Sequence, residues 1–226
     1  MLSLATILAV AGTLVLLVAI MITYFVFDNY KPSRRKREQD LATMRQLIRS
    51  SIPELIPWSH EERNLLSFER IDNRTRKLSG RRAAGYFKNI YHEPVVAYQY
   101  RRYLSPKRYA LLLLRTTEHE WIYYLQPDKT TVYLDGDELG ELSDAGILYD
   151  TKSRRAVARL TPDPDALLQK VLVQGREVGN LINPAYDDRF NPRAFELLQP
   201  MNEREEGYFL ALSLLHMTAV AEEAQR

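Results

Sequence analysis

The chain begins with an unbroken apolar stretch. From Leu2 to Phe27 it contains apolar residues, Gly12 and a few hydroxyl side chains, and no charge. At the helical rise of about 1.5 Å per residue, this stretch is longer than the roughly 20 residues that cross a bilayer core. A cleaved signal peptide instead has a basic start, an apolar core of about 7 to 15 residues and a small-residue cleavage site, and the stretch has none of these. The pattern therefore predicts a transmembrane anchor over residues 1–30.

Basic residues follow the apolar stretch directly. This juxtamembrane cluster consists of Lys31, Arg34, Arg35, Lys36 and Arg37. Tyr24 and Phe25 precede it, and aromatic residues favour the membrane interface. Because loops rich in Lys and Arg stay in the cytoplasm, we expect a single-pass protein of the cell or inner membrane. Its N-terminus would face outside and its C-terminal body would be cytoplasmic.

Residues 31–66 are interpreted as the basic juxtamembrane segment and a linker with short helices. Apolar residues recur at helical spacing, at Leu41, Met44, Leu47 and Ile48. Ser59 and Glu62 have the spacing of a capping box. Pro53 and Pro57 would interrupt any longer helix.

Residues 67–226 are expected to form one domain. The first part of this domain contains short runs rich in β-branched and aromatic residues. Such runs occupy 95–104, 108–116, 120–125 and 130–134. Their composition and near-regular spacing predict an all-β barrel or sandwich. The segments GILYD and RRAVARL flank Thr151–Ser153 as a further hairpin. About a dozen candidate strands can be counted between residue 65 and Pro200.

Two segments that lie 39 residues apart share one frame. Val132–Leu142 reads VYLDGDELGEL, and Val171–Leu181 reads VLVQGREVGNL. Each predicts a strand, a tight turn whose glycine takes a positive φ, and a returning strand with a second glycine at a bulge or close approach. The turn glycines are Gly136 and Gly175, and the second glycines are Gly140 and Gly179.

A clear helix follows the strands. Asn202 and Glu205 form a capping pair, and the helical pattern continues to about Glu222. Its centre, Tyr208–Val220, is apolar on all sides apart from three residues, Ser213, His216 and Thr218. A helix that is apolar all round must be buried. A stretch of about 13 residues favours a core helix over a second membrane span.

The two repeated segments, together with the hydrophobic helix YFLALSLLHM, resemble the tubby C-terminal-like superfamily. This superfamily includes tubby-like proteins, phospholipid scramblases and LURP-one-related proteins. The resemblance covers about residues 65–223 and implies a closed antiparallel barrel of twelve strands around the C-terminal helix. It also implies binding of anionic phospholipids through basic side chains on the barrel, without catalytic residues. The chain departs from the scramblase pattern because it has no cysteine for acylation and its span lies at the opposite end.

Charge is divided unevenly along the chain. Residues 70–108 carry 11 basic and two acidic side chains, whereas residues 109–226 carry 12 basic and 20 acidic ones. Such asymmetry is typical of contact with an anionic surface, a membrane or a nucleic acid. The alternative is that the two halves interleave in one fold and neutralise each other. No recognised module or stacking aromatic signature accompanies the charge, so we expect no nucleic-acid partner.

The candidate lipid-binding residues lie between residues 74 and 88, a segment without an acidic side chain. They are Arg74, Arg76, Lys77, Arg81, Arg82 and Lys88. A turn at Ser79-Gly80 would bring the two basic groups side by side. Near an anionic leaflet each Lys or Arg contributes about 1 kcal/mol of binding.

Other candidate sites are weaker. The chain has no cysteine, which excludes disulfides, thiol catalysis and thiolate metal sites. The histidines His60, His92, His119 and His216 show no metal-ligand spacing. Asp135 and Asp137 begin like a calcium loop, but Leu139 and Gly146 stand where ligands are needed. The motif NPAY at 183–186 is explained by an ordinary turn. We therefore expect no metal, no cofactor and no catalytic residue.

These observations favour a membrane-anchored, non-enzymatic binding module that contacts anionic phospholipid. A structural or accessory subunit of a membrane protein complex is the first alternative, and a scramblase-like lipid transporter is the second. In a complex, the span would pack on partner helices through small residues, namely Ala5, Ala9, Gly12 and Thr13.

Overall fold

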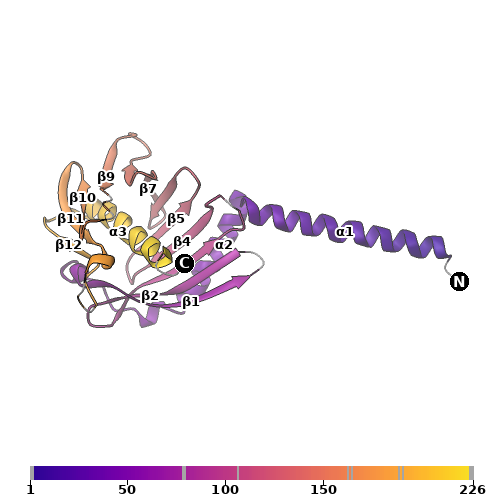
Figure 1. Ribbon diagram of the computed structural model, residues 1–226, viewed down its shortest axis with the longest axis horizontal. Coiled ribbons are helices and arrows are strands. Elements are labelled where there is room, and N and C mark those ends of the chain that lie inside the picture. Colours follow the sequence, from indigo (N-terminus) through magenta and orange to yellow (C-terminus); the bar gives the residue numbers. More distant parts are fainter. Residues whose placement is uncertain are drawn as a thin grey trace.

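The computed structural model describes residues 3–77, 80–105, 107–161, 163, 165–187, 189 and 191–223. Helix α1 (Leu4–Tyr30) projects from a body that contains α2 (Arg34–Arg49), twelve strands in the described residues, and α3 (Glu203–Glu223) (Figure 1). Short 3-10 helices occupy Ile52–Glu54, His60–Leu65 and Pro184–Tyr186. The strands are β1 (Leu66–Lys77), β2 (Gly80–Asn89), β3 (Pro94–Arg102), β4 (Ala110–Arg115), β5 (Glu120–Leu125), β6 (Thr130–Leu134), β7 (Asp137–Leu142), β8 (Ile147–Tyr149), β9 (Ala156–Leu160), β10 (Leu168–Val173), β11 (Arg176–Ile182) and β12 (Phe195–Leu197).

The strands form one sheet in sequence order, and every neighbouring pair is antiparallel. The sheet curls until its two ends meet beside β1 and β12. There Ser67 forms an isolated bridge with Arg193, and the Ala194 N–H donates to the Leu66 carbonyl at 2.7 Å. The prediction of a mainly β, twelve-stranded antiparallel barrel is therefore confirmed, although the barrel is nearly closed rather than joined by a continuous ladder.

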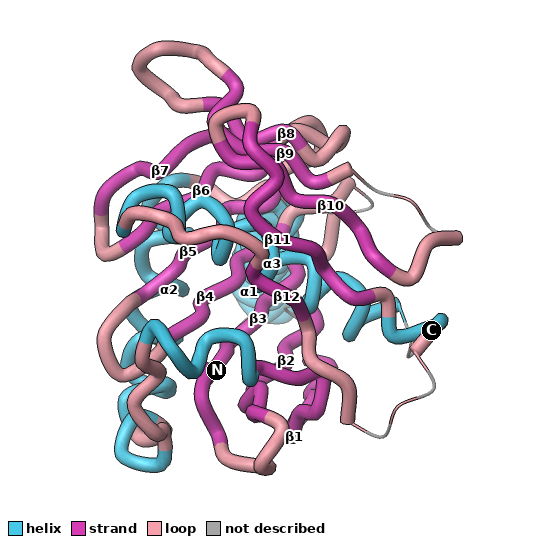
Figure 2. The backbone as a smooth tube through the Cα atoms, turned by 90° about the vertical axis from the view of Figure 1, so that its left-hand side faces the viewer, coloured by secondary structure: helices cyan, strands magenta, loops and turns pink. Residues whose placement is uncertain are grey.

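Helix α3 lies inside this barrel, and the strands surround it in the view of Figure 2. Phe209 packs edge-to-face on Phe195 of β12, with ring centroids 5.2 Å apart. The hydroxyl of the fully buried Tyr123 donates to the Ala211 carbonyl at 2.9 Å. At the helix start, the Asn202 side chain accepts from the Glu205 N–H, and the Glu205 carboxylate accepts from the Asn202 N–H. The predicted buried helix and its capping pair are both confirmed.

The two repeated segments form the β6–β7 and β10–β11 hairpins, as expected. In both turns the first residue and the glycine have positive φ, +94° at Gly136 and +81° at Gly175, which is the geometry of a type I′ turn. Each hairpin also has a register shift beside its second glycine. A Cβ added at Gly179 would lie 2.5 Å from the Glu196 carbonyl oxygen. Only glycine allows this close approach of β11 to β12.

The segment expected to be a linker is a packed part of the body. Helix α2 runs without a break from Arg34, so four of the juxtamembrane basic residues belong to its first turn. Leu41, Met44 and Ile48 are buried against the outer face of β3, β4 and β5, while Leu47 is exposed. The expected helical periodicity is correct, and the expected capping box at Ser59 and Glu62 opens the second 3-10 helix.

Helix α1 makes few contacts with the body. Its apolar side chains from Leu14 to Phe27 are exposed. Among the described helices it is the one whose length and composition suit a membrane crossing, over Ala11–Tyr30. A membrane anchor and a signal sequence share these properties. Gly12 and Thr13 are exposed, whereas the side chains of Ala5 and Ala9 lie outside the described part of the structure.

The buried helix generates the first prediction. Leu212 is 3% exposed on α3, so Leu212→Asp places an unpaired charge in the core. We expect a loss of about 3 to 5 kcal/mol in the free energy of unfolding, measured as a lowered melting temperature of the full chain in detergent. The control is Leu47→Asp on α2, where the leucine is 50% exposed and melting should change little. Equal melting of both variants and wild type would show that α3 is not a core helix.

Candidate anion-binding surface

The end of α1 is attached directly to the barrel. Asn29, in the last turn of α1, is 2% exposed. Its carbonyl accepts the Leu104 N–H at 2.9 Å, and its side-chain oxygen accepts from Arg101 Nη2 at 3.2 Å. Arg101 is the second-last residue of β3, and Leu104 lies in the turn between β3 and β4. The β3–β4 turn therefore lies beside the point where α1 leaves the body.

A buried ion pair fixes α2 at the same place. Arg101 Nη1 lies 2.5 Å from Asp40 Oδ1, and both side chains are 6% exposed. The second oxygen of Asp40 accepts the Tyr103 hydroxyl at 2.9 Å, and Lys36 Nζ lies 3.4 Å from Oδ1. Burial lowers the pKa of Arg101 and raises that of Tyr103, while the Asp40 charge raises both. Removing one partner of such a pair leaves an uncompensated buried charge, which typically costs about 3 to 5 kcal/mol.

A second ionic contact holds the far half of α2. Arg45 donates to both oxygens of Glu120 on β5, with Nη2 2.5 Å from Oε1. Arg115 Nη1 donates to the same carboxylate at 3.3 Å. The hydrogen bond with Glu120 raises the pKa of Arg45. With the apolar contacts of α2 between them, the two ionic contacts make α2 a fixed bridge between α1 and the barrel.

Because the strands are sequential and antiparallel, every second turn lies at the same end of the barrel. The β1–β2, β3–β4 and β5–β6 turns share an end, called here the proximal end because α1 leaves beside it. In Figure 1 the tip of the β1–β2 hairpin points to the side on which α1 projects. The β2–β3 and β4–β5 turns lie at the opposite, distal end.

Basic residues meet at the proximal end. Arg76 of β1 is in register with Arg81 of β2, which is in register with Arg102 of β3. The hairpin thus brings the two basic groups side by side, as expected, although the turn residues 78 and 79 and the side chains of Arg74, Arg76 and Lys77 lie outside the described part. Arg81 is exposed and Arg102 half-buried, and Lys107 and Arg108 are exposed on the next turn. Like charges in register on neighbouring strands destabilise a sheet, so this arrangement favours an anionic partner.

The predicted juxtamembrane cluster divides into two groups. Lys31 and Arg35 are exposed, and Arg34 is exposed in a surface pair with Glu38. Lys36 belongs to the Asp40 contact, and Arg37 lies over the Tyr124 ring at 5.3 Å from its centroid. Two of the five therefore contribute to packing, a role that the sequence interpretation did not assign.

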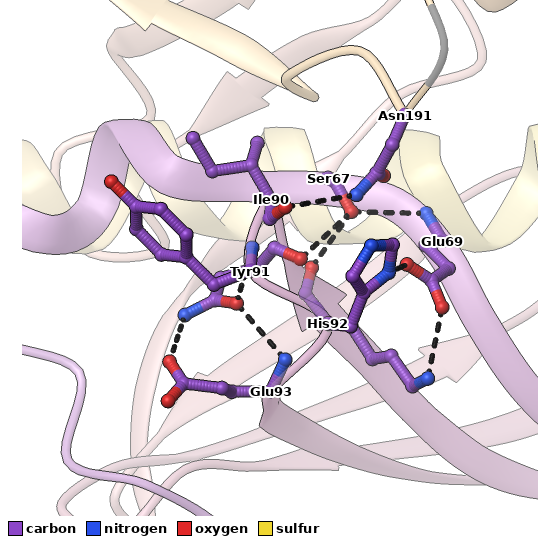
Figure 3. Close-up of polar contacts among 9 residues, drawn as sticks. Ser67, Glu69, Ile90, Tyr91, His92, Glu93 and Asn191 are labelled. Atoms are coloured by element: carbon purple, nitrogen blue, oxygen red, sulfur yellow. Dashed lines mark hydrogen bonds and ion pairs between the residues drawn. The ribbon is translucent and has the colours of Figure 1, made fainter.

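Two of the predicted lipid-binding residues differ from Arg81: Arg82 is less exposed, and Lys88 lies at the other end of the strand. Arg82 is half-buried and in register with the buried Arg101. Lys88 lies near the distal end of β2, where its Nζ contacts the Glu69 carboxylate at 2.8 Å. Glu69 also contacts His92, and this polar group closes the β2–β3 turn (Figure 3). The hydrogen bond from Lys88 lowers the pKa of Glu69, so Lys88 has a structural partner far from the proximal end.

Negative charge gathers on the other side of the proximal end. The exposed acids on the β5–β6, β7–β8 and β9–β10 turns are Asp128, Asp144, Asp163 and Asp165. Sequential strand order places the basic residues 70–108 on β1–β3 and the acidic remainder on the following strands. The two halves of the sequence do not interleave, and the charge asymmetry is preserved in space.

The other candidate groups have local partners. His60 contacts Glu206, and His119 Nδ1 lies 2.7 Å from Asp135, which also accepts the Glu120 N–H. His216 is half-buried on α3. No group of three His, Asp or Glu side chains suited to a metal occurs in the described residues. Asn183–Tyr186 forms a capped 3-10 turn.

Comparison of the chain with models of protein families, with curated proteins and with solved structures gave no match.

Proposed function

We propose that the chain is a single-pass membrane protein whose body binds anionic phospholipid through the proximal end of its barrel. One observation carries this proposal: the exposed basic residues lie at the end from which the apolar helix α1 leaves. A bilayer crossed by α1 would therefore lie next to them. We propose that the protein acts by binding, without catalysis.

The positive charges at the proximal end are numerous enough to attract an anionic leaflet. The exposed members that the structure describes are Lys31, Arg34, Arg35, Arg81, Lys107 and Arg108. At about 1 kcal/mol for each Lys or Arg near an anionic leaflet, even half of them would orient a body that α1 already holds at the membrane. The interaction should weaken with salt, because exposed charges are screened over about 10 Å at 0.1 M.

The resemblance to the tubby C-terminal-like superfamily supports the same function. A nearly closed barrel of twelve strands around a C-terminal helix fits the arrangement that this resemblance implies. Membership of that superfamily, and with it lipid binding by the barrel, is part of the proposal. The accessory-subunit hypothesis predicts that the body shows no preference between anionic and neutral lipid. Exchange measurements in anionic and neutral nanodiscs test this preference.

The proposed orientation places the body in the cytoplasm, because the basic cluster follows α1. A protease added to the outside of intact cells should leave residues 31–226 whole, and permeabilising the cells should expose them to digestion. The fragments can be followed with an antibody against the C-terminus. Digestion of the body in intact cells would mean that it faces outside, which would contradict the proposed orientation.

The proposed lipid contact can be tested on the full chain in nanodiscs. In discs of phosphatidylcholine with phosphatidylglycerol, amide hydrogen exchange of residues 80–86 should be severalfold slower than in discs of phosphatidylcholine alone. About 1 M salt, which shortens the screening length to about 3 Å, should remove the difference.

Matched variants separate this contact from general charge effects. Lys107→Gln with Arg108→Gln on the proximal β3–β4 turn should reduce the protection of residues 80–86. Lys152→Gln with Arg155→Gln removes the same charge from exposed positions on the distal β8–β9 turn and should leave the protection unchanged. Identical exchange in both kinds of disc at low salt would refute the lipid contact and favour the accessory-subunit hypothesis.

A further inference from the structure

A small cavity lies where α1, α2 and the barrel meet. Its volume is about 200 Å³, which is roughly the volume that six or seven molecules occupy in liquid water. Lys31, the first residue after α1, forms part of its wall, so the cavity lies at the level where the chain leaves the span. The lining residues are Lys31, Pro32, Arg37, Tyr103, Tyr109, Ala110, Tyr124, Leu125 and Gln126.

The charge of this cavity is positive and uncompensated. Its wall contains two cations, Lys31 and Arg37, and the described lining includes no acidic residue. Among the described residues no carboxylate lies within ion-pair distance of either cation. Neighbouring basic residues differ in this respect, since Arg34 pairs with Glu38 and Lys36 with Asp40.

Arg37 is held in place but is not satisfied. Its guanidinium lies over the Tyr124 ring, and its Nε is buried without a hydrogen-bond partner. The Nε atoms of Arg63, Arg82, Arg101 and Arg115 are buried without a partner as well, so this atom alone does not indicate a ligand. What distinguishes Arg37 is that it lines the cavity together with Lys31 and has no carboxylate partner among the described residues. A guanidinium in that position can donate to phosphate oxygens.

The walls of the cavity are held by contacts with neighbouring side chains. The Tyr103 hydroxyl donates a hydrogen bond to Asp40. The Tyr124 ring packs edge-to-face on the Tyr133 ring, with their centroids 5.5 Å apart. The Gln126 side chain adds a polar group to the wall. A rigid cavity with a few placed polar groups is typical of a small-molecule site, whereas the exposed basic residues nearby are typical of diffuse surface attraction.

We infer that this cavity binds one phosphate group of an anionic lipid headgroup, with Lys31 and Arg37 as its ligands. The inference rests on the proposed function for the presence of a membrane beside the cavity. It adds a defined, single binding position at the junction of span and barrel to the general attraction of the proximal end.

The test uses the purified full chain in a non-ionic detergent, titrated with dihexanoyl phosphatidylglycerol or dihexanoyl phosphatidylcholine and observed by native mass spectrometry. Wild type should bind one phosphatidylglycerol in preference to phosphatidylcholine. Because two charged hydrogen-bonding groups are lost, Lys31→Gln with Arg37→Gln should weaken binding about a hundredfold. Inorganic phosphate should compete only at much higher concentration, since it has no acyl chains to hold it beside the span.

The matched control is Arg34→Gln with Arg35→Gln, which removes the same number of positive charges from the first turn of α2, at positions that do not line the cavity. It should weaken binding by less than about threefold, as exposed charges do. Lys31→Gln alone changes an exposed residue, so it tests the cavity even if the Arg37 variant melts early, and it should also weaken binding.

Three results would overturn the inference. Equal losses in the two double variants would replace the cavity with a diffuse surface and leave the proposed function intact. Equal binding of the two lipids by wild type would refute the cavity, while slowed exchange in anionic nanodiscs would still support the surface contact. Competition by inorganic phosphate at the concentration of the lipid would assign the cavity to a soluble phosphate.

Discussion

The buried ion pair between Arg101 and Asp40 is the contact on which the arrangement of α1, α2 and the barrel depends. A charge in a protein interior is costly unless it is paired, and here the Tyr103 hydroxyl and the side-chain oxygen of Asn29 add hydrogen bonds to the pair. These residues come from the end of α1, from α2 and from β3 with the turn after it. The pair therefore joins three parts of the chain, and the apolar packing of α2 and its Arg45–Glu120 contact reinforce this junction. If α1 crosses a membrane, the barrel meets that membrane in one orientation.

The topology of the barrel determines what this orientation presents. Strands that follow one another in sequence are also neighbours in space, so a basic segment and an acidic segment remain in separate sectors. A fold with long crossovers would have mixed them. Here the basic sector lies beside the end of α1, and the acids of the later turns lie on the remaining part of the same end. Attachment and charge are thus placed together by the order of the strands.

Much of the fold could be predicted from local patterns. The period of Leu41, Met44 and Ile48, the glycines of the two repeated hairpins and the apolar centre of α3 each express a constraint within a few residues. The contacts of the site could not be predicted in this way, because Asp40 and Arg101 are 61 residues apart. Lys88 shows the limit of counting charges along a segment. It lies seven residues after Arg81, about 23 Å along an extended strand, and so reaches the other end of the barrel.

The central claim, that α1 and the barrel are held in one fixed arrangement by the contacts of Asn29, Asp40 and Arg101, can be tested directly by electron–electron double resonance. The chain has no cysteine, so a spin-label pair at Phe27→Cys on α1 and Lys152→Cys on the distal turn, both exposed, would be the sole label pair. The account predicts one narrow distance distribution in detergent and in nanodiscs, and Asp40→Asn should broaden it. A broad distribution in the chain that keeps Asp40 would contradict the account, because it would mean that the barrel moves freely relative to α1.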